Sequence, residues 1–248
     1  MPDKDNTIGD IIESEKDLLL EAEEKYGDYF KNAAGFNELL NSFLKSANPD
    51  AWIFILFLSQ IKKHHLLALF SIIRRHHIQA MLNMRQVLEA GVNAAYAIEY
   101  PDQDKFVVKR DDGFIDAPQK LQSKRYTWLK DNHKEKSDFI KNMKDSINNS
   151  CAHSNLIYAF SNFDMDLIEK KVFGTPFFDN ENDFMTKTDL WMIGNIVLGL
   201  LDLFYGVNKT GKTLVFADDF VPRLKELEAQ NHALKAELEK HPRRTKVE

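Results

Sequence analysis

Cysteine is almost absent from this chain of 248 residues, which contains a single one, Cys151. One cysteine cannot form an internal disulfide, so the fold has to rely on its hydrophobic core, as is usual in a reducing cytosol. Glycine and proline are also scarce, with 10 and 7 residues. This scarcity favours long helices over a fold that is built from many turns.

Long uninterrupted apolar runs are missing as well. The longest, AWIFILFLSQI at residues 51–61, is followed directly by KKHH. A helix that crosses a membrane needs about 20 apolar residues. The opening stretch MPDKDNTIGDIIESEKD is acidic and lacks the apolar core of a signal peptide. We therefore expect a soluble cytoplasmic protein with no membrane partner.

Charge and histidine content also limit the function. A formal net charge of −5 argues against a protein that coats nucleic acid, although a local basic patch is compatible with it. Histidines occur in two adjacent pairs, His64–His65 and His76–His77. Zinc needs three or four convergent ligands, and neither a cysteine cluster nor an H-E-x-x-H motif accompanies these pairs. We expect no metal and no other cofactor.

Helical periodicity extends along most of the chain. Apolar residues recur at spacings of three and four, which predicts amphipathic helices. Pro49 bars the helical conformation for Asn48, so one helix ends before it, and Asp50 is placed to cap the next. Pro101 ends a later helix. The predicted helices cover residues 7–25, 36–45, 51–73, 76–100, 117–132, 136–160 and 187–205.

Two short stretches have a different pattern. KFVVKRDDGFID, residues 105–116, places Asp-Gly after a β-branched run, as in a small hairpin, and residues 162–179 form a second irregular or β-like insert. The predicted fold is a mainly α helical bundle with two short β-like inserts and a C-terminal coiled-coil-like helix. We divide it into N-terminal helices (1–48), a bundle domain (49–212) and a C-terminal helix with a basic tail (213–248).

The stretch GVNKTGKT, residues 206–213, fits the phosphate-binding pattern G-x-x-x-x-G-K-[ST]. A true phosphate loop follows a buried strand and opens a helix. Here the preceding residues have a helical pattern, and Pro222 follows Thr213 too closely to leave room for a crossover helix. We interpret the stretch as a turn and expect no nucleotide binding.

The C-terminal segment FVPRLKELEAQNHALKAELEKHP carries a heptad pattern. A lone Asn at an a position, with Leu at the d positions, is typical of parallel two-stranded coiled coils. The alternative is that this leucine stripe packs on its own domain. The expected homodimer would form through Leu224, Leu227, Asn231, Leu234 and Leu238.

Polar residues that could form a functional site occur in two parts of the sequence. Arg85 and Glu89 are four residues apart on a helix that is apolar on two sides, so they can pair and are expected to be substantially buried. Later, SINNSCAHSN gathers small polar residues around His153. An imidazole titrates near neutrality, so His153 can serve as a general acid or base.

The stretches FSIIRRHHIQAMLNMRQVLEAGVNAAYAI and INNSCAHSNLIYAF resemble an uncharacterised bacterial family of all-helical proteins, which is similar to the HEPN superfamily. The resemblance covers roughly residues 50–207. Its members carry an Arg-x-x-x-Glu pair on a central helix, here Arg85 and Glu89, and a later histidine motif, here at His153. The resemblance implies a homodimeric helical bundle and metal-independent cleavage of RNA in bacterial stress or phage defence.

This chain departs from the HEPN pattern, which is an Arg, four to six intervening residues and then His. The permitted positions before His153 hold Ser146, Ile147 and Asn148, and none is Arg. Asn148 could supply a polar side chain there, and Arg85 could supply the cation. Two functions stay open. One is a HEPN-like ribonuclease with His153, Asn148, Arg85 and Glu89 in its site, and the other is a non-catalytic homodimeric binding or regulatory scaffold.

Overall fold

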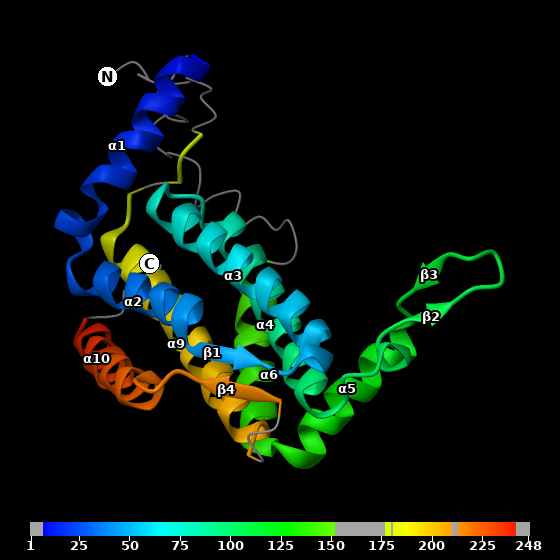
Figure 1. The fold of residues 1–248 in the computed structure, drawn as a ribbon. Helices are drawn as coiled ribbons and strands as arrows, with labels where there is room; N and C mark the ends of the chain where they lie inside the picture. The colour runs from blue at the N-terminus through cyan, green and yellow to red at the C-terminus, as the bar shows by residue number, and fades with distance from the viewer. Residues whose placement is uncertain (1–6, 152–176, 180, 210–212, 242–248) are drawn as a thin grey trace.

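The computed structural model describes residues 7–151, 177–179, 181–209 and 213–241 (Figure 1). Within these ranges the chain forms eight α-helices and two small two-stranded sheets, which confirms the predicted mainly α fold. The helices are α1 (Ile8–Tyr26), α2 (Asp28–Ser42), α3 (Trp52–Ile73), α4 (His77–Glu99), α5 (Gln119–Asn132), α6 (Lys134–Cys151), α9 (Asp183–Val207) and α10 (Phe220–Lys240). The strands are β1 (Leu44–Ala47), β2 (Val108–Lys109), β3 (Ile115–Asp116) and β4 (Leu214–Phe216).

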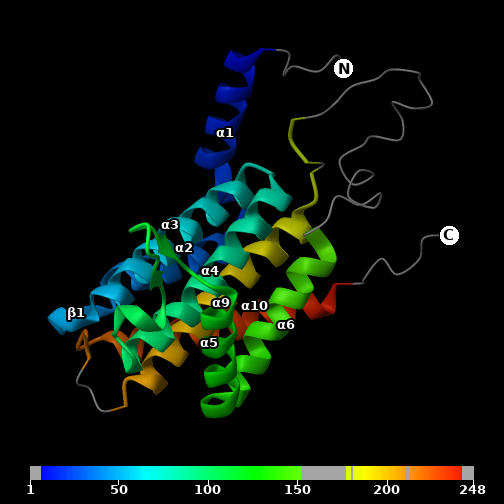
Figure 2. The same cartoon turned by 90° about the vertical axis from the view of Figure 1, so that its right-hand side faces the viewer.

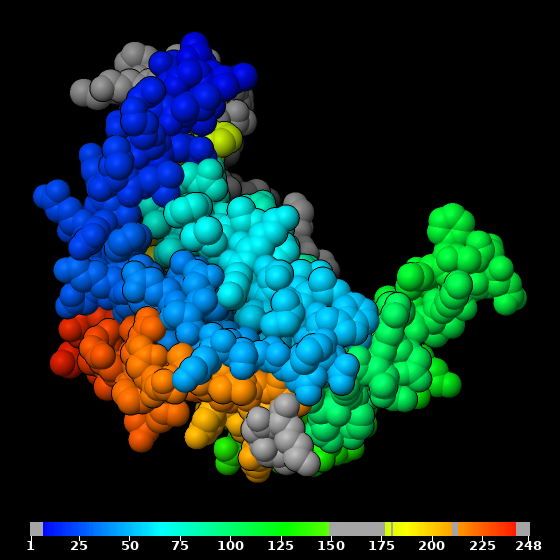
Figure 3. Space-filling view, viewed as in Figure 1, coloured from blue at the N-terminus to red at the C-terminus, as the bar shows by residue number. Residues whose placement is uncertain are grey.

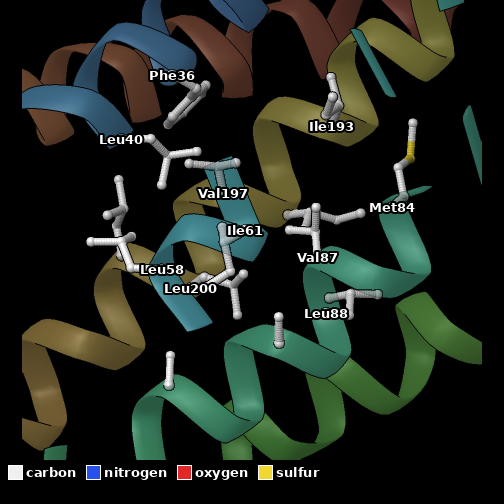
Figure 4. Close-up of a cluster of buried hydrophobic side chains, with 14 of the residues drawn as sticks. Phe36, Leu40, Leu58, Ile61, Met84, Val87, Leu88, Ile193, Val197 and Leu200 are labelled. Atoms are coloured by element: carbon white, nitrogen blue, oxygen red, sulfur yellow. The ribbon is translucent and has the colours of Figure 1, made fainter. Parts of the chain in front are cut away.

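Helix α9 occupies the centre of the bundle. It packs against α2, α3, α4, α6 and α10, and α3 and α4 form a closely packed antiparallel pair beside it (Figures 1 and 2). The N-terminal part of α1 extends beyond the rest of the bundle in both views. The hydrophobic core is one continuous cluster to which all three predicted parts of the chain contribute (Figure 4). Its members include Phe36, Leu40, Leu58, Ile61, Met84, Val87, Leu88, Ile193, Val197 and Leu200.

Local signals explain several of the helix boundaries. Thr7 and Asp10 form a capping box at the start of α1, and Gly27, with a φ of 52°, separates α1 from α2. Because this single glycine is the only interruption, α2 begins at Asp28, earlier than the predicted residue 36. The predicted cap at Asp50 is wrong: Oδ1 of Asn48 accepts from the backbone N–H of Asp50 instead.

One of the two sheets was predicted and the other was not. The hairpin at residues 105–116 is confirmed as β2 and β3, with Gly113 at a φ of 85° in its turn. Strand β1 was assigned partly to a helix, and it pairs antiparallel with β4 instead. The backbone N–H of Asn48 also donates to the carbonyl of Thr213, which continues this ribbon. Of the second predicted β-like insert, residues 162–179, all but 177–179 lies outside the described residues.

The leucine stripe of α10 packs on its own chain, as the alternative interpretation stated. Asn231 is fully buried, and its carbonyl accepts a hydrogen bond of 3.1 Å from Nε1 of Trp191 on α9. Leu227 lies so close to Gly35 of α2 that a Cβ at Gly35 would be 2.8 Å from Cδ2 of Leu227. Phe220 and Leu234 are buried as well. These seam residues are engaged within one chain, and homodimerisation stays a prediction.

Two helical segments, Pro49–Ile73 and Asp183–Val207, are long and apolar enough to cross a membrane by length and composition. The sequence-based expectation counted only uninterrupted apolar runs, whereas these segments also include polar residues, such as KKHH at residues 62–65. Core helices of soluble proteins pass the same test, and 39% and 50% of the two apolar windows are buried inside the fold. The cytoplasmic location stays a prediction.

Candidate functional site

Arg85 and Glu89 form the predicted ion pair on α4. Nε of Arg85 lies 3.2 Å from Oε1 of Glu89, one helical turn away. The two side chains retain 36% and 23% of their exposure, so the expectation of substantial burial is wrong for Arg85. The reason is that α4 turns its most apolar side toward α3 and α9, while this pair lies toward α6. The guanidinium is therefore within reach of solvent and of ligands.

Helix α6 contributes a second pair of polar side chains, Lys144 and Asn148, which are also one turn apart. Nη1 of Arg85 donates to Oδ1 of Asn148 at 2.9 Å. Nζ of Lys144 lies 3.1 Å from Oε1 of Glu89. Three contacts thus link the four side chains between α4 and α6, and we call this group the ring because the α6 backbone between Lys144 and Asn148 completes it. The structure brings together three of the four predicted site residues.

Histidine 153, the fourth predicted site residue, lies outside the described residues. In the sequence it follows Asn148 by five positions and Cys151, the last residue of α6, by two. The described part of the chain therefore reaches to within two residues of the proposed acid or base.

The ionisation states of the ring follow from burial and from the opposite charges. Burial favours the neutral form of Glu89, but Lys144 and Arg85 outweigh it, and the pKa of this carboxyl lies below its usual value. Burial likewise opposes the charge on Lys144, but hydrogen bonds with Tyr126 and Glu89 raise the pKa of its ammonium. At neutral pH the ring therefore holds two cations and one carboxylate, a net charge of about +1.

A pocket of about 340 Å³ opens next to the ring, between α5 and α6. Tyr126 of α5 stands at its edge, where its hydroxyl accepts a hydrogen bond of 2.9 Å from Nζ of Lys144. Lys144 and Asn148 line the pocket together with Lys130 and Lys141, which are exposed. Asp145 is the one carboxylate among its lining residues and pairs with Lys141 at 2.8 Å. Cations thus outnumber carboxylates on the pocket wall.

Two of the three guanidinium nitrogens of Arg85 are engaged by protein side chains. Nε and Nη1 are held by Glu89 and Asn148. Within the described residues no hydrogen bond is made by Nη2 of Arg85. Nη2 carries two N–H groups, and these can donate to an oxygen of a phosphate or carboxylate while Nε and Nη1 keep the guanidinium in place.

Two members of this site, Lys144 and Tyr126, were not predicted from the sequence. Lys144 lies four residues before Asn148, so the helical spacing that placed Arg85 beside Glu89 also places Lys144 on the face of Asn148. That signal was present in the sequence. Tyr126 comes from α5, and no local pattern relates its position to that of α6.

The GVNKTGKT stretch has the flanks that were predicted for a turn. Its first two residues, Gly206 and Val207, end helix α9, and the short strand β4 follows the stretch directly. Asn208 links both ends, because its side chain accepts from the N–H of Leu214 and donates to the carbonyl of Leu214. Oγ1 of Thr213 donates to the carbonyl of Ile98 at 3.1 Å. Residues 210–212 lie outside the described residues, and the absence of nucleotide binding stays a prediction.

Comparison with protein-family models, with curated proteins and with solved structures found no match for this chain. The resemblance to HEPN helical bundles is therefore carried by the sequence motifs alone.

Proposed function

We propose that the face formed by Arg85, Lys144 and Asn148 binds the phosphate backbone of RNA, in a HEPN-like protein that cleaves the bound strand without a metal ion. The observation that carries this proposal is that Nη2 of Arg85 makes no hydrogen bond to the described residues while Nε and Nη1 are held. Its side chain retains 36% exposure, and two of its three nitrogens are already positioned by protein groups. Such a fixed cation loses little side-chain entropy when it binds a phosphate oxygen.

The missing arginine of the HEPN pattern is replaced in this proposal by a cation from another helix. Asn148 stands at one of the positions where that pattern has its Arg, and it holds Nη1 of Arg85 at 2.9 Å. The guanidinium would stabilise the negative charge that develops on phosphorus during cleavage. His153 would take the proton of the attacking ribose hydroxyl or give one to the leaving oxygen.

A non-catalytic binding module is the second candidate, and the ring itself favours it. Glu89 engages both cations, with oxygen-to-nitrogen distances of 3.2 Å to Arg85 and 3.1 Å to Lys144. A closed ring of this kind also serves to hold α4 and α6 together without any ligand. In that case the face binds RNA or another anion, or nothing, and no bond is broken.

Binding and cleavage are measured separately to distinguish these candidates. Anisotropy of a fluorescent single-stranded RNA at several salt concentrations gives the number of phosphate contacts. We expect Arg85→Ala to weaken binding and to reduce the slope of log K against log salt by about 0.7. Arg110→Ala is the matched control, because Arg110 lies 52% exposed on the β2–β3 hairpin. It should leave both quantities unchanged.

Cleavage of the same RNA is followed on gels in the presence of EDTA. The ribonuclease proposal expects cleavage by the wild type, and loss of cleavage with retained RNA binding in His153→Ala. Binding without cleavage by the wild type would favour the non-catalytic module. Wild-type protein that neither binds nor cleaves RNA at low salt would contradict the proposed RNA function.

A further inference from the structure

Helix α3 has two apolar faces, and only one of them belongs to the core. Its inner face carries fully buried residues such as Phe54 and Ile61. Along the opposite side run large apolar side chains that remain between 37% and 56% exposed. We call these residues the α3 outer face: Trp52, Ile55, Leu56, Leu66, Leu67 and Phe70. Figure 3 shows the surface of α3, in cyan, open to solvent in the middle of that view.

The order of residues along this face is symmetric about position 61. Each apolar residue on one side has an apolar counterpart at the same separation on the other side, and the two polar residues near the centre also correspond. The matched positions are Trp52 with Phe70, Ile55 with Leu67, Leu56 with Leu66, and Ser59 with Lys63.

Such an order of residues suits an antiparallel two-fold interface. When a helix pairs with its own copy about an axis perpendicular to the helices, each residue meets the residue at the mirrored position on the second copy. An axis at Ile61 would set Trp52 against Phe70 of the second copy. It would also set Lys63, the charged residue of this stripe, against the hydroxyl of Ser59 rather than against another lysine.

We propose that two copies of this chain pair through the α3 outer face, with a two-fold axis that crosses the helix at the level of Ile61, between the exposed Ser59 and Lys63. The six apolar side chains expose roughly 500 Å², near the upper end of what a monomer shows as one patch. With the exposed polar residues between them, the face approaches the ~800 Å² per partner of a stable interface. The leucine stripe of α10 is already engaged in the core.

Sedimentation equilibrium of the full chain tests this proposal. We expect a dimer at micromolar concentration, and a dissociation constant raised at least ~100-fold by Leu56→Glu or by Leu66→Lys, because each buries an unpaired charge at the contact. Phe114→Glu is the control, since Phe114 is 70% exposed on the hairpin and should leave the dimer unchanged. Circular dichroism checks that each variant folds, and Leu56→Asn replaces any Leu56→Glu protein that does not.

The position of the axis is tested with two double variants. Leu56→Glu combined with Leu66→Lys should pair again, because the new carboxylate of one copy then meets the new ammonium of the other. Leu56→Glu combined with Phe70→Lys should stay monomeric, because positions 56 and 70 do not face each other. Restoration by the second combination, or failure of the first, would overturn the axis at Ile61.

A monomeric wild type at ~100 µM, or a dimer that is insensitive to Leu56→Glu, would overturn the proposal as a whole. Cosedimentation with vesicles of phosphatidylcholine and phosphatidylglycerol tests the alternative that this apolar face binds a membrane surface. A monomeric wild type that binds these vesicles, and loses this binding in Leu56→Glu, would assign the face to a membrane surface instead. None of these outcomes depends on the proposed action on RNA.

Discussion

Arg85 on α4 donates from Nη1 to Oδ1 of Asn148 on α6, at a distance of 2.9 Å. This bond joins two residues that are 63 positions apart in the sequence. It connects the ion pair of α4 with the last turns of α6, and therefore with the segment that leads to His153. Asn148 is a neutral acceptor here, so it positions the guanidinium without cancelling its charge.

The role of an uncharged side chain at position 148 can be tested by replacing Asn148 with Asp, which has nearly the same shape. We expect Asn148→Asp to keep the acceptor for Arg85 and to leave the free energy of unfolding unchanged or higher, since the hydrogen bond becomes charge-assisted. RNA affinity should fall about tenfold or more at low salt, because the added charge cancels one cation. Asn148→Ala, which removes the acceptor, should lower stability instead. Equal RNA affinity for Asn148→Asp and wild type would place the phosphate contact elsewhere.

Glu89 contacts both cations of the ring, so its replacement should lower the free energy of unfolding. Glu89→Gln leaves Arg85 and Lys144 without their shared carboxylate, and we expect a loss of about 1–3 kcal/mol in urea unfolding at pH 7. Glu21→Gln, an exposed change on α1, is the control and should cost less than about 0.5 kcal/mol.

The same variant has a predicted pH dependence. The pKa of Glu89 lies below its unfolded value, so its contribution is present above about pH 4.3 and is lost as the pH falls through the folded pKa. The difference in stability between wild type and Glu89→Gln should therefore shrink at acidic pH. A difference that grows with acidification would contradict this assignment.

His65 should make the fold sensitive to mild acid. It is fully buried, its Nδ1 lies 3.2 Å from Oδ1 of Asn37, and Nε2 has no partner within the described residues. Burial lowers the pKa of its imidazole to about 3. Below pH ~6.5 the unfolded chain therefore binds a proton at this imidazole, whereas the folded chain does not. For each pH unit between about 6.5 and 3, the free energy of unfolding falls by up to ~1.4 kcal/mol.

Replacement of this imidazole should remove that part of the acid sensitivity. His65→Leu is expected to show a smaller loss of unfolding free energy between pH 6.5 and 4.5 than wild type, as measured by chemical denaturation. His232→Gln, an exposed change on α10, should follow the wild-type curve. Parallel curves for His65→Leu and wild type would show that His65 is protonated in the folded protein.

Two glycines on neighbouring helices should respond in opposite ways to alanine. A Cβ at Gly91 would lie 2.4 Å from Cδ2 of the buried Leu200, so Gly91→Ala should cost about 1–3 kcal/mol in thermal or urea unfolding. A Cβ at Gly206, in the last turn of α9, would meet nothing within 4 Å. Gly206→Ala should therefore be neutral or stabilise the helix by up to ~1 kcal/mol. Destabilisation at Gly206 would point to a role for the GVNKTGKT stretch beyond a turn.

The helices could be predicted from the sequence because their signals are local. Apolar spacing and Pro101 mark the extent of α4, and the Asp-Gly dipeptide marks the β2–β3 turn. Strand β1 could not be predicted in this way. Its four residues become a strand because β4, about 170 residues later, offers backbone hydrogen bonds.

The site was partly predictable for the same reason. The spacing of Arg85 and Glu89 indicates that they pair on one helix, but the exposure of their side chains depends on where α6 crosses α4. The heptad pattern of α10 shows the opposite limit. A leucine stripe with one Asn indicates a helix face that packs against other helices. The pattern is the same whether these helices belong to a second copy or, as α2 and α9 do, to the same chain.

The packing of α2 against α9 and α10 has a consequence for the synthesis of this protein. α2 ends at Ser42, whereas α10 starts at Phe220, so the ribosome adds nearly 180 residues between them. At 5–20 residues per second, the apolar side of α2 waits roughly 10–40 s for the helices that cover it. During that time Phe36 and Leu40 are exposed on a nascent chain. The fold can close only after α10 has emerged from the ribosome, and until then the N-terminal helices are natural targets for chaperones that bind apolar segments.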